Sequence, residues 1–181
     1  MAVTEQRNVG ASIPRKEDPE LLTGRGMYTD DLVLPGMLHM ILVRSPFAHA
    51  TITGVDVSKA ASMPGVVAAY SGEDLASEWA GPLPVAWPVT PDIKSAPMWP
   101  ITRDKARYQG DVVAVVVAES TAQAKDAAEA VEVGYDELPV VVGIEAALAE
   151  GAPILHEEHG TNALYTWTLT NGDVDAAFAN S

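Results

Sequence analysis

The fold is decided by residues 112–135, which read VVAVVVA-ES-TAQAKDAAEA-VEVGY. The first seven residues are uninterrupted apolar and mostly β-branched, which is typical of a strand buried on both faces. Ser120 or Thr121 can cap a helix that continues to Val131 and places its alanines on one face. Residues 131–135 then form a second strand. Because the order is strand, helix, strand, we expect the two strands to lie parallel with a right-handed crossover.

Three further strands are expected upstream of this unit. Residues 37–44 are apolar and bounded by Pro-Gly and Ser-Pro, and residues 50–57 and 66–70 have similar length and composition. In the second of these strands the apolar positions change parity at Gly54, which predicts a β-bulge. The short connection between the first two favours an antiparallel hairpin. The whole pattern predicts an α/β fold with an α+β mixed sheet.

The chain is expected to divide into three parts. Residues 1–18 are polar and aperiodic and form an N-terminal arm, in which no apolar core of a signal peptide is found. Residues 19–145 form the compact domain, which begins with one helical turn that ends at Gly24. A short helix is expected at 144–150, where the domain ends, and residues 146–181 form a trailing segment with a strand at 163–170 and a helix at 172–178.

Composition narrows the possible functions. The chain has 181 residues, 48% of them hydrophobic, a net charge of −14 and no cysteine. The absence of cysteine excludes disulfides, thiolate zinc sites and iron–sulfur ligation by these residues. The acidic charge argues against nucleic acid and anionic lipid as partners, and no apolar run approaches the length of about 18 residues that spans a bilayer. We therefore expect a cytoplasmic chain without membrane insertion.

Histidines and short polar motifs are the candidate catalytic and metal-binding features. His156 and His159 flank two glutamates, but they are three positions apart where a helical zinc motif needs four, so a solvated loop is favoured. His39 and His49 are expected to be structural, since a general base needs a partner within hydrogen-bond reach. A small autonomous enzyme built on these two histidines and nearby carboxylates is a third-ranked hypothesis.

Two motifs near the amino terminus are interpreted as turns. Gly24-Arg25-Gly26 lacks the remaining residues of a phosphate loop or dinucleotide fold, and it predicts two glycines with positive φ. Asp30-Asp31 lacks the further oxygen ligands of a calcium loop and is expected to cap or turn the chain.

A proline-rich stretch, residues 82–100, carries Trp87 and Trp99 and lies beside Trp79. These tryptophans could pack on the domain's own core, or they could form a contact surface for another domain or subunit. The second possibility supports an alternative function, a free-standing interaction module that uses residues 79–100.

Several local signatures, in order along the chain, resemble one family. They are EDPELLTGRGMYTDD at 17–31, LPGMLH at 34–39, VRSPFAHA at 43–50, RYQGD at 107–111 and YDELP at 135–139. The sequence resembles the α/β hammerhead domain of the molybdenum-binding large subunit in the xanthine dehydrogenase and aldehyde oxidase family, with carbon monoxide dehydrogenase large chain-like proteins as the nearest branch.

The resemblance implies an N-terminal structural and interface domain of a molybdenum-dependent oxidoreductase, inactive by itself. In the full-length subunit it implies a molybdenum-pterin dinucleotide, with iron–sulfur clusters and FAD on partner subunits or domains. The family's catalytic glutamate and cofactor loops lie downstream, so no catalytic, cofactor-binding or metal residue is assigned among residues 1–181. Residues 146–181 become the linker and the start of the cofactor-binding region. Downstream molybdenum-binding domains and the FAD-binding and iron–sulfur subunits are the expected partners.

Overall fold

The computed structural model describes residues 9, 10, 12–84, 90, 92–167 and 171–181. The chain separates into two compact units, Met1–Met37 and Leu38–Ser181. Each unit is described by itself.

The first unit contains two short helical turns, α1 (Asp18–Leu22) and a 3-10 turn (Thr29–Asp31). The hydroxyl of Thr23 donates to the Pro19 carbonyl at 2.6 Å, and Gly24 leaves the helix with φ of +67°. The predicted helical turn ending at Gly24 is therefore confirmed. Of the two predicted positive-φ glycines, Gly24 has that conformation and Gly26 does not. As expected for a turn-forming pair, the Asp31 carboxylate accepts the Tyr28 N–H at 2.9 Å.

In the second unit a three-stranded sheet has the order β1 (His39–Arg44), β5 (Val112–Ala118), β3 (Val66–Ser71). Both pairings are antiparallel. The β-branched run forms the central strand, as its composition predicts, and Val113 and Val116 are fully buried there.

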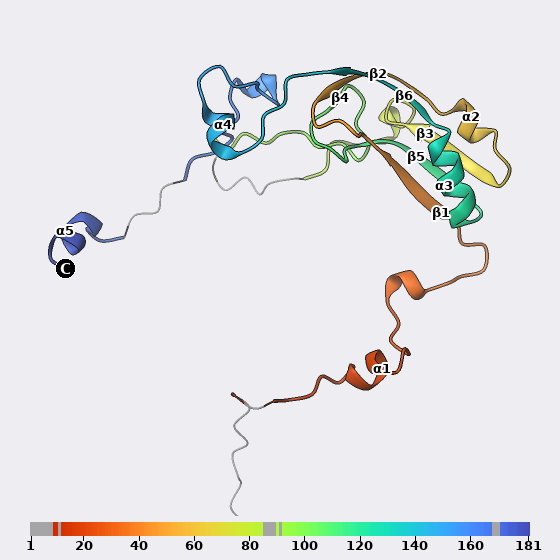
Figure 1. Cartoon of the computed structure of the whole chain (residues 1–181), viewed down its shortest axis with the longest axis horizontal. Helices are drawn as coiled ribbons and strands as arrows, with labels where there is room; N and C mark the ends of the chain where they lie inside the picture. Colours follow the sequence, from red (N-terminus) through yellow and green to blue (C-terminus); the bar gives the residue numbers. More distant parts are fainter. Residues whose placement is uncertain (1–8, 11, 85–89, 91, 168–170) are drawn as a thin grey trace, which may run out of the picture. The chain divides into compact units, whose positions relative to one another are not determined.

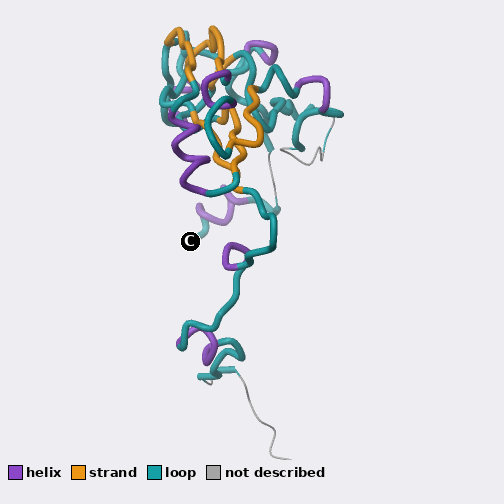
Figure 2. Tube along the Cα trace, turned by 90° about the vertical axis from the view of Figure 1, so that its right-hand side faces the viewer, coloured by secondary structure: helices purple, strands orange, loops and turns teal. Residues whose placement is uncertain are grey.

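Helix α3 (Thr121–Glu129) and the short α2 (Ser58–Ala61) pack against this sheet (Figures 1 and 2). Ser120 caps α3 by accepting the Gln123 N–H, which confirms the predicted cap. The alanine face of α3 lies inward, and a small-residue core results: Ala60, Ala69, Val116 and Ala127. Small side chains let the helix approach the sheet closely.

The second sheet has the order β4 (Lys105–Ala106), β2 (Ala50–Asp56), β6 (Glu132–Glu137), again antiparallel. The register of β2 shifts between Ile52 and Gly54, so the predicted bulge is confirmed. Because of the extra residue, Ile52 opposite Tyr135 and Val55 opposite Val133 fall on one face. The same bulge brings Thr53 so close to Gly134 that a Cβ there would collide with its hydroxyl.

Two predicted strand pairings are wrong. Strands β1 and β2 do not form a hairpin, and β5 and β6 are not a parallel pair, because in each case the two strands lie in different sheets. In both cases the chain passes from the β1–β5–β3 sheet to the other sheet. A crossover rule applies only to strands of one sheet, so the helix between β5 and β6 does not determine their orientation here.

The remaining helical segments are short: 3-10 turns at Ala76–Glu78 and Glu157–His159, α4 (Ile144–Leu148) and α5 (Val174–Ala179). The predicted helices at 144–150 and 172–178 correspond to α4 and α5. The predicted strand at 163–170 is wrong over its described part, residues 163–167, and residues 168–170 lie outside the described residues. In that part the Leu164 carbonyl accepts the Lys94 N–H at 3.1 Å, so it bonds to a loop and not to a strand.

Candidate functional site

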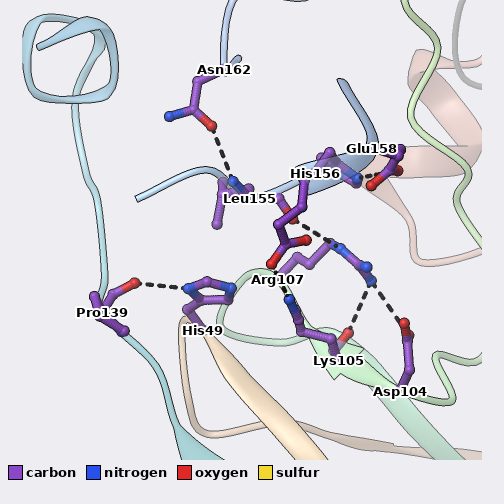
Figure 3. A network of polar contacts seen from close by, with 10 residues as sticks. His49, Asp104, Lys105, Arg107, Pro139, Leu155, His156, Glu158 and Asn162 are labelled. Carbon is purple, nitrogen blue, oxygen red and sulfur yellow. Dashed lines mark hydrogen bonds and ion pairs between the residues drawn. The ribbon is translucent and has the colours of Figure 1, made fainter. Parts of the chain in front are cut away.

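Arg107, just after β4, is the centre of a polar network (Figure 3). Its Nε donates to the Leu155 carbonyl at 3.3 Å and its Nη1 to the Lys105 carbonyl, also at 3.3 Å. The same Nη1 lies 3.5 Å from the Asp104 carboxylate. The guanidinium group thereby joins β4 to a segment 48 residues further along the chain.

A second set of contacts holds the same two segments together. Lys105 forms an ion pair with Glu157, whose pKa is lowered chiefly by the hydrogen bond that Lys105 donates. The His156 Nδ1 lies 3.4 Å from the Glu158 carboxylate. The motif at 156–159 therefore contains a 3-10 turn, in which Glu157 faces Lys105 of the domain and Glu158 faces His156 of the motif itself.

Asn162 forms a further set of contacts with the segment around Leu155. Its Oδ1 accepts the Leu155 N–H at 3.1 Å, and its Nδ2 donates to the carbonyls of Ala147 and Pro153 at 3.0 and 2.8 Å. One side chain thus satisfies three backbone groups of a loop that has little regular structure of its own.

His49 and His39 lie in different places. His49 is 5% exposed, and its Nδ1 is 2.7 Å from the Pro139 carbonyl, so Nδ1 must carry the proton. His39 lies in β1, where its Nδ1 is 3.0 Å from the Thr121 hydroxyl. His39 lies in β1, whereas His49 immediately precedes β2 of the other sheet, so the two histidines do not form one site. The geometry therefore gives no support to an autonomous enzyme built on them.

A cavity of about 470 Å³ adjoins the Arg107 network. Its walls are mostly apolar, with contributions from Ala96, Met98, Trp99 and Leu155. Asp111 also lines it and is 8% exposed. Burial raises the pKa of Asp111, although its carboxylate accepts the Arg107 N–H at 3.1 Å. The arrangement can hold an apolar group, but it offers no paired acid and base.

The described tryptophans of the proline-rich region pack on each other. The rings of Trp79 and Trp99 stack with centroids 5.8 Å apart, and the Arg103 guanidinium lies 5.2 Å from the Trp99 ring. Both tryptophans are partly buried, which is packing within the domain's own fold. Trp87 lies outside the described residues.

The described side chains do not fit a metal ion, and the sequence does not fit an iron–sulfur cofactor. The described part of the chain brings together no group of three histidine, cysteine, aspartate or glutamate side chains that could hold a metal ion. The sequence has no cysteine to ligate a cluster. Across the described residues, no helix combines the length and the apolar character needed to cross a membrane.

The second unit is an α+β domain with two antiparallel sheets and a small-residue core under α3. The side chains of its polar network join segments that are far apart in the sequence, so they stabilise the fold. The family model described as the aldehyde oxidase and xanthine dehydrogenase a/b hammerhead domain matches residues 23–139. The chain belongs to this family.

Curated relatives are similar over almost the whole chain. The nicotine 6-hydroxylase large subunit of Paenarthrobacter nicotinovorans is 40% identical over 97% of this chain and 21% of its own length. The carbon monoxide dehydrogenase large chain of Hydrogenophaga pseudoflava is 39% identical over 92% of this chain and 21% of its own. The chain thus spans about a fifth of the length of these relatives.

Solved structures of the same family share the fold. Quinoline 2-oxidoreductase from Pseudomonas putida 86 has a TM-score of 0.77 and 44% identity, over 86% of this chain and 20% of that one. The aldehyde oxidoreductase from Desulfovibrio desulfuricans has a TM-score of 0.73 and 31% identity, over 87% and 17%. The expected α/β hammerhead fold is therefore confirmed.

The Arg107 and Asn162 contacts had no sequence signal. Apart from the Asp104 carboxylate beside Arg107, their partners are backbone carbonyls and amides, which no pattern of residue types could reveal.

Proposed function

We propose that this chain is the hammerhead domain of the large subunit of a molybdenum hydroxylase, where it acts as a scaffold and interface domain. One observation carries the proposal: the similarity to the relatives covers nearly all of this chain but only about a fifth of the relatives' own length. One of these relatives, 37% identical, is named a xanthine dehydrogenase molybdenum-binding subunit.

The proposed cofactors belong to other parts of the assembly. A molybdenum-pterin dinucleotide would be bound downstream in the same subunit, and iron–sulfur clusters and FAD by partner subunits or domains. The described residues here do not fit a metal site, so no reaction step is assigned to them. In this proposal residues 1–18 are an N-terminal arm, residues 19–145 the hammerhead domain, and residues 146–181 the linker and the start of the cofactor-binding region. Its partners are the downstream molybdenum-binding domains and the FAD-binding and iron–sulfur subunits, and its location is cytoplasmic.

The proposed role of this domain does not depend on the substrate of the enzyme. Large subunits named for nicotine and for carbon monoxide are 40% and 39% identical to this chain. A domain that is equally similar to enzymes of such different substrates is a shared scaffold, and substrate selectivity then depends on residues elsewhere in the subunit.

The test uses the complete reading frame that contains this sequence, expressed with its neighbouring subunit genes. We expect the product to contain molybdenum by elemental analysis and to lose it, together with the assembled complex, when residues 19–145 are deleted. The 181-residue chain expressed alone should contain no stoichiometric molybdenum and should show no dye-linked oxidation of aldehydes, purines or carbon monoxide. Molybdenum bound by the 181-residue chain itself would disprove the scaffold role.

A further inference from the structure

Asn171 and Gly172 form the one Asn-Gly pair of the sequence and lie just before α5. In such a pair the backbone nitrogen of the glycine lies next to the asparagine amide, and the glycine has no side chain to shield that nitrogen. Gly172 has φ of +71°, and neither residue belongs to a helix or a strand. The backbone of the pair is therefore not held in a hydrogen-bonded ladder.

The other two asparagines in the described part of the chain have their side-chain amides held by hydrogen bonds. The Nδ2 of Asn162 donates to two backbone carbonyls, at 3.0 and 2.8 Å. The Nδ2 of Asn180 donates to the Ala176 carbonyl at 2.7 Å. No hydrogen bond joins the Asn171 side chain to a described residue. Its Cγ can therefore turn toward the next backbone nitrogen without first breaking a contact of the kind that holds the other two.

We infer that Asn171 is a site of spontaneous covalent modification, at which the side-chain amide becomes a carboxylate without an enzyme. The Gly172 nitrogen forms a bond to Cγ of Asn171, the Cγ–Nδ2 bond breaks, and ammonia leaves with the proton of the Gly172 nitrogen. Water then adds to one of the two carbonyl carbons of the resulting five-membered succinimide. Opening of the ring gives aspartate, or isoaspartate when the main chain continues through the side-chain carbon.

The reacting atoms belong to two neighbouring residues, so the reaction requires no other part of the chain and does not rest on the proposed function. Its product differs in charge and in backbone next to α5. Asp173 caps this helix by accepting the Ala176 N–H at 2.9 Å. The product has a second carboxylate close to that of Asp173 and, as isoaspartate, a longer main chain just before the cap.

Incubation of the 181-residue chain in heavy-oxygen water at neutral and mildly basic pH tests the inference, because the added water labels the new carboxylate. By peptide mass spectrometry we expect label at Asn171 to accumulate at least ten times faster than at Asn162 or Asn180. The rate should increase with pH, since the Gly172 nitrogen attacks after it loses its proton. Asn171→Gln should remove the label from this position, because glutamine would have to close a less favourable six-membered ring.

Ala163→Gly is the matched control, because it creates a second Asn-Gly pair whose asparagine is held by hydrogen bonds. In the folded variant, label at Asn162 should accumulate at least ten times more slowly than at Asn171. In guanidinium chloride, which unfolds the chain, the two rates should become similar. Should this variant fail to fold, Asn180 of the natural chain, folded and in guanidinium chloride, supplies the comparison between a held and a released asparagine.

Three results would overturn the inference. The first is an Asn171 that stays unlabelled in the folded chain. The second is an Asn171 whose label accumulates at a tenth or less of its rate in guanidinium chloride, which would mean that the folded chain protects it. The third is equal labelling of the two Asn-Gly pairs in the folded Ala163→Gly variant, which would mean that the side-chain contacts do not select the site.

Discussion

The Nδ1 of His49 lies 2.7 Å from the carbonyl oxygen of Pro139, and the Leu138 N–H donates back to the His49 carbonyl at 3.0 Å. These two bonds fasten the corner before β2 to the chain that leaves β6. His49→Phe keeps a ring but removes the donor, and we expect it to lower the free energy of unfolding by about 1–3 kcal/mol. Urea denaturation measures the change. His39→Phe, which removes a contact to the exposed Thr121, should cost no more than about 0.5 kcal/mol, and equal losses would contradict the role of His49.

Val116 is the central apolar contact between β5 and α3. It is fully buried, so Val116→Asp places an unpaired charge in the core at a cost of several kcal/mol, against a total stability of about 5–15 kcal/mol. We expect the variant to lack a cooperative thermal transition by circular dichroism. Val67→Asp serves as the control, because Val67 lies in β3 of the same sheet and is 55% exposed. Similar melting of both variants would mean that β5 is not the central strand.

Gly72 lies against backbone. A Cβ there would stand 2.7 Å from the Thr102 carbonyl oxygen and 2.8 Å from that of Ile101. Backbone yields less readily than a side chain, so Gly72→Ala should destabilise the domain by about 1–3 kcal/mol in urea denaturation. Gly54→Ala is the control, since nothing lies within 4 Å of its Cβ position. A harmless Gly72→Ala would refute the close packing of these loops.

Asn162 holds the loop after α4 by three hydrogen bonds. Asn162→Ala leaves those backbone groups to water and should speed amide exchange over residues 153–164 by at least tenfold, while exchange in β5 stays slow. Hydrogen-exchange mass spectrometry resolves the two regions. Asn180→Ala, at the exposed C-cap of α5, should change neither. Unaltered exchange after the Asn162 substitution would show that the loop is held by other contacts.

Asp111 makes stability depend on pH. Burial raises its pKa above the ordinary 3.8, so the folded state binds this proton more readily than the unfolded state. The free energy of unfolding therefore falls as pH rises from 3.8 through the raised value. Asp111→Asn cannot ionise and keeps an oxygen for the Arg107 N–H. Its stability relative to the natural chain should thus increase with pH across this window and then level off, measured by urea denaturation at a series of pH values. A relative stability that decreases would show that the buried charge is well solvated.

The strands and helices that depend on local composition were predictable. The run at 112–118, the cap at Ser120 and the bulge at Gly54 are properties of neighbouring residues, and each is found in the structure. The pairing of those strands was not predictable by the same means. Short connections favour hairpins and strand–helix–strand units favour parallel pairs, but residues 45–49 and the chain after α3 pass from one sheet to the other.

The polar network was beyond sequence reasoning for a different reason. Arg107 and Asn162 bind backbone atoms that come close only after the domain has folded. The motif 156–159 was singled out for its histidines, but its contacts to the domain are the Glu157–Lys105 ion pair and the hydrogen bond that the Lys94 Nζ donates to the His159 carbonyl. A surface ion pair of this kind leaves no characteristic spacing in the sequence.

The division of consecutive strands between two sheets has a consequence during synthesis on the ribosome. β1 pairs with β5 and β2 with β6, so the first strand of each sheet is translated long before its partner. This raises the contact order, and high contact order slows folding. Until Glu137 has left the exit tunnel, β2 lacks its long partner, and until Ala118 has done so the apolar strand β1 has none. Nascent chains that stall before this point therefore carry an unpaired apolar strand, a feature that favours aggregation.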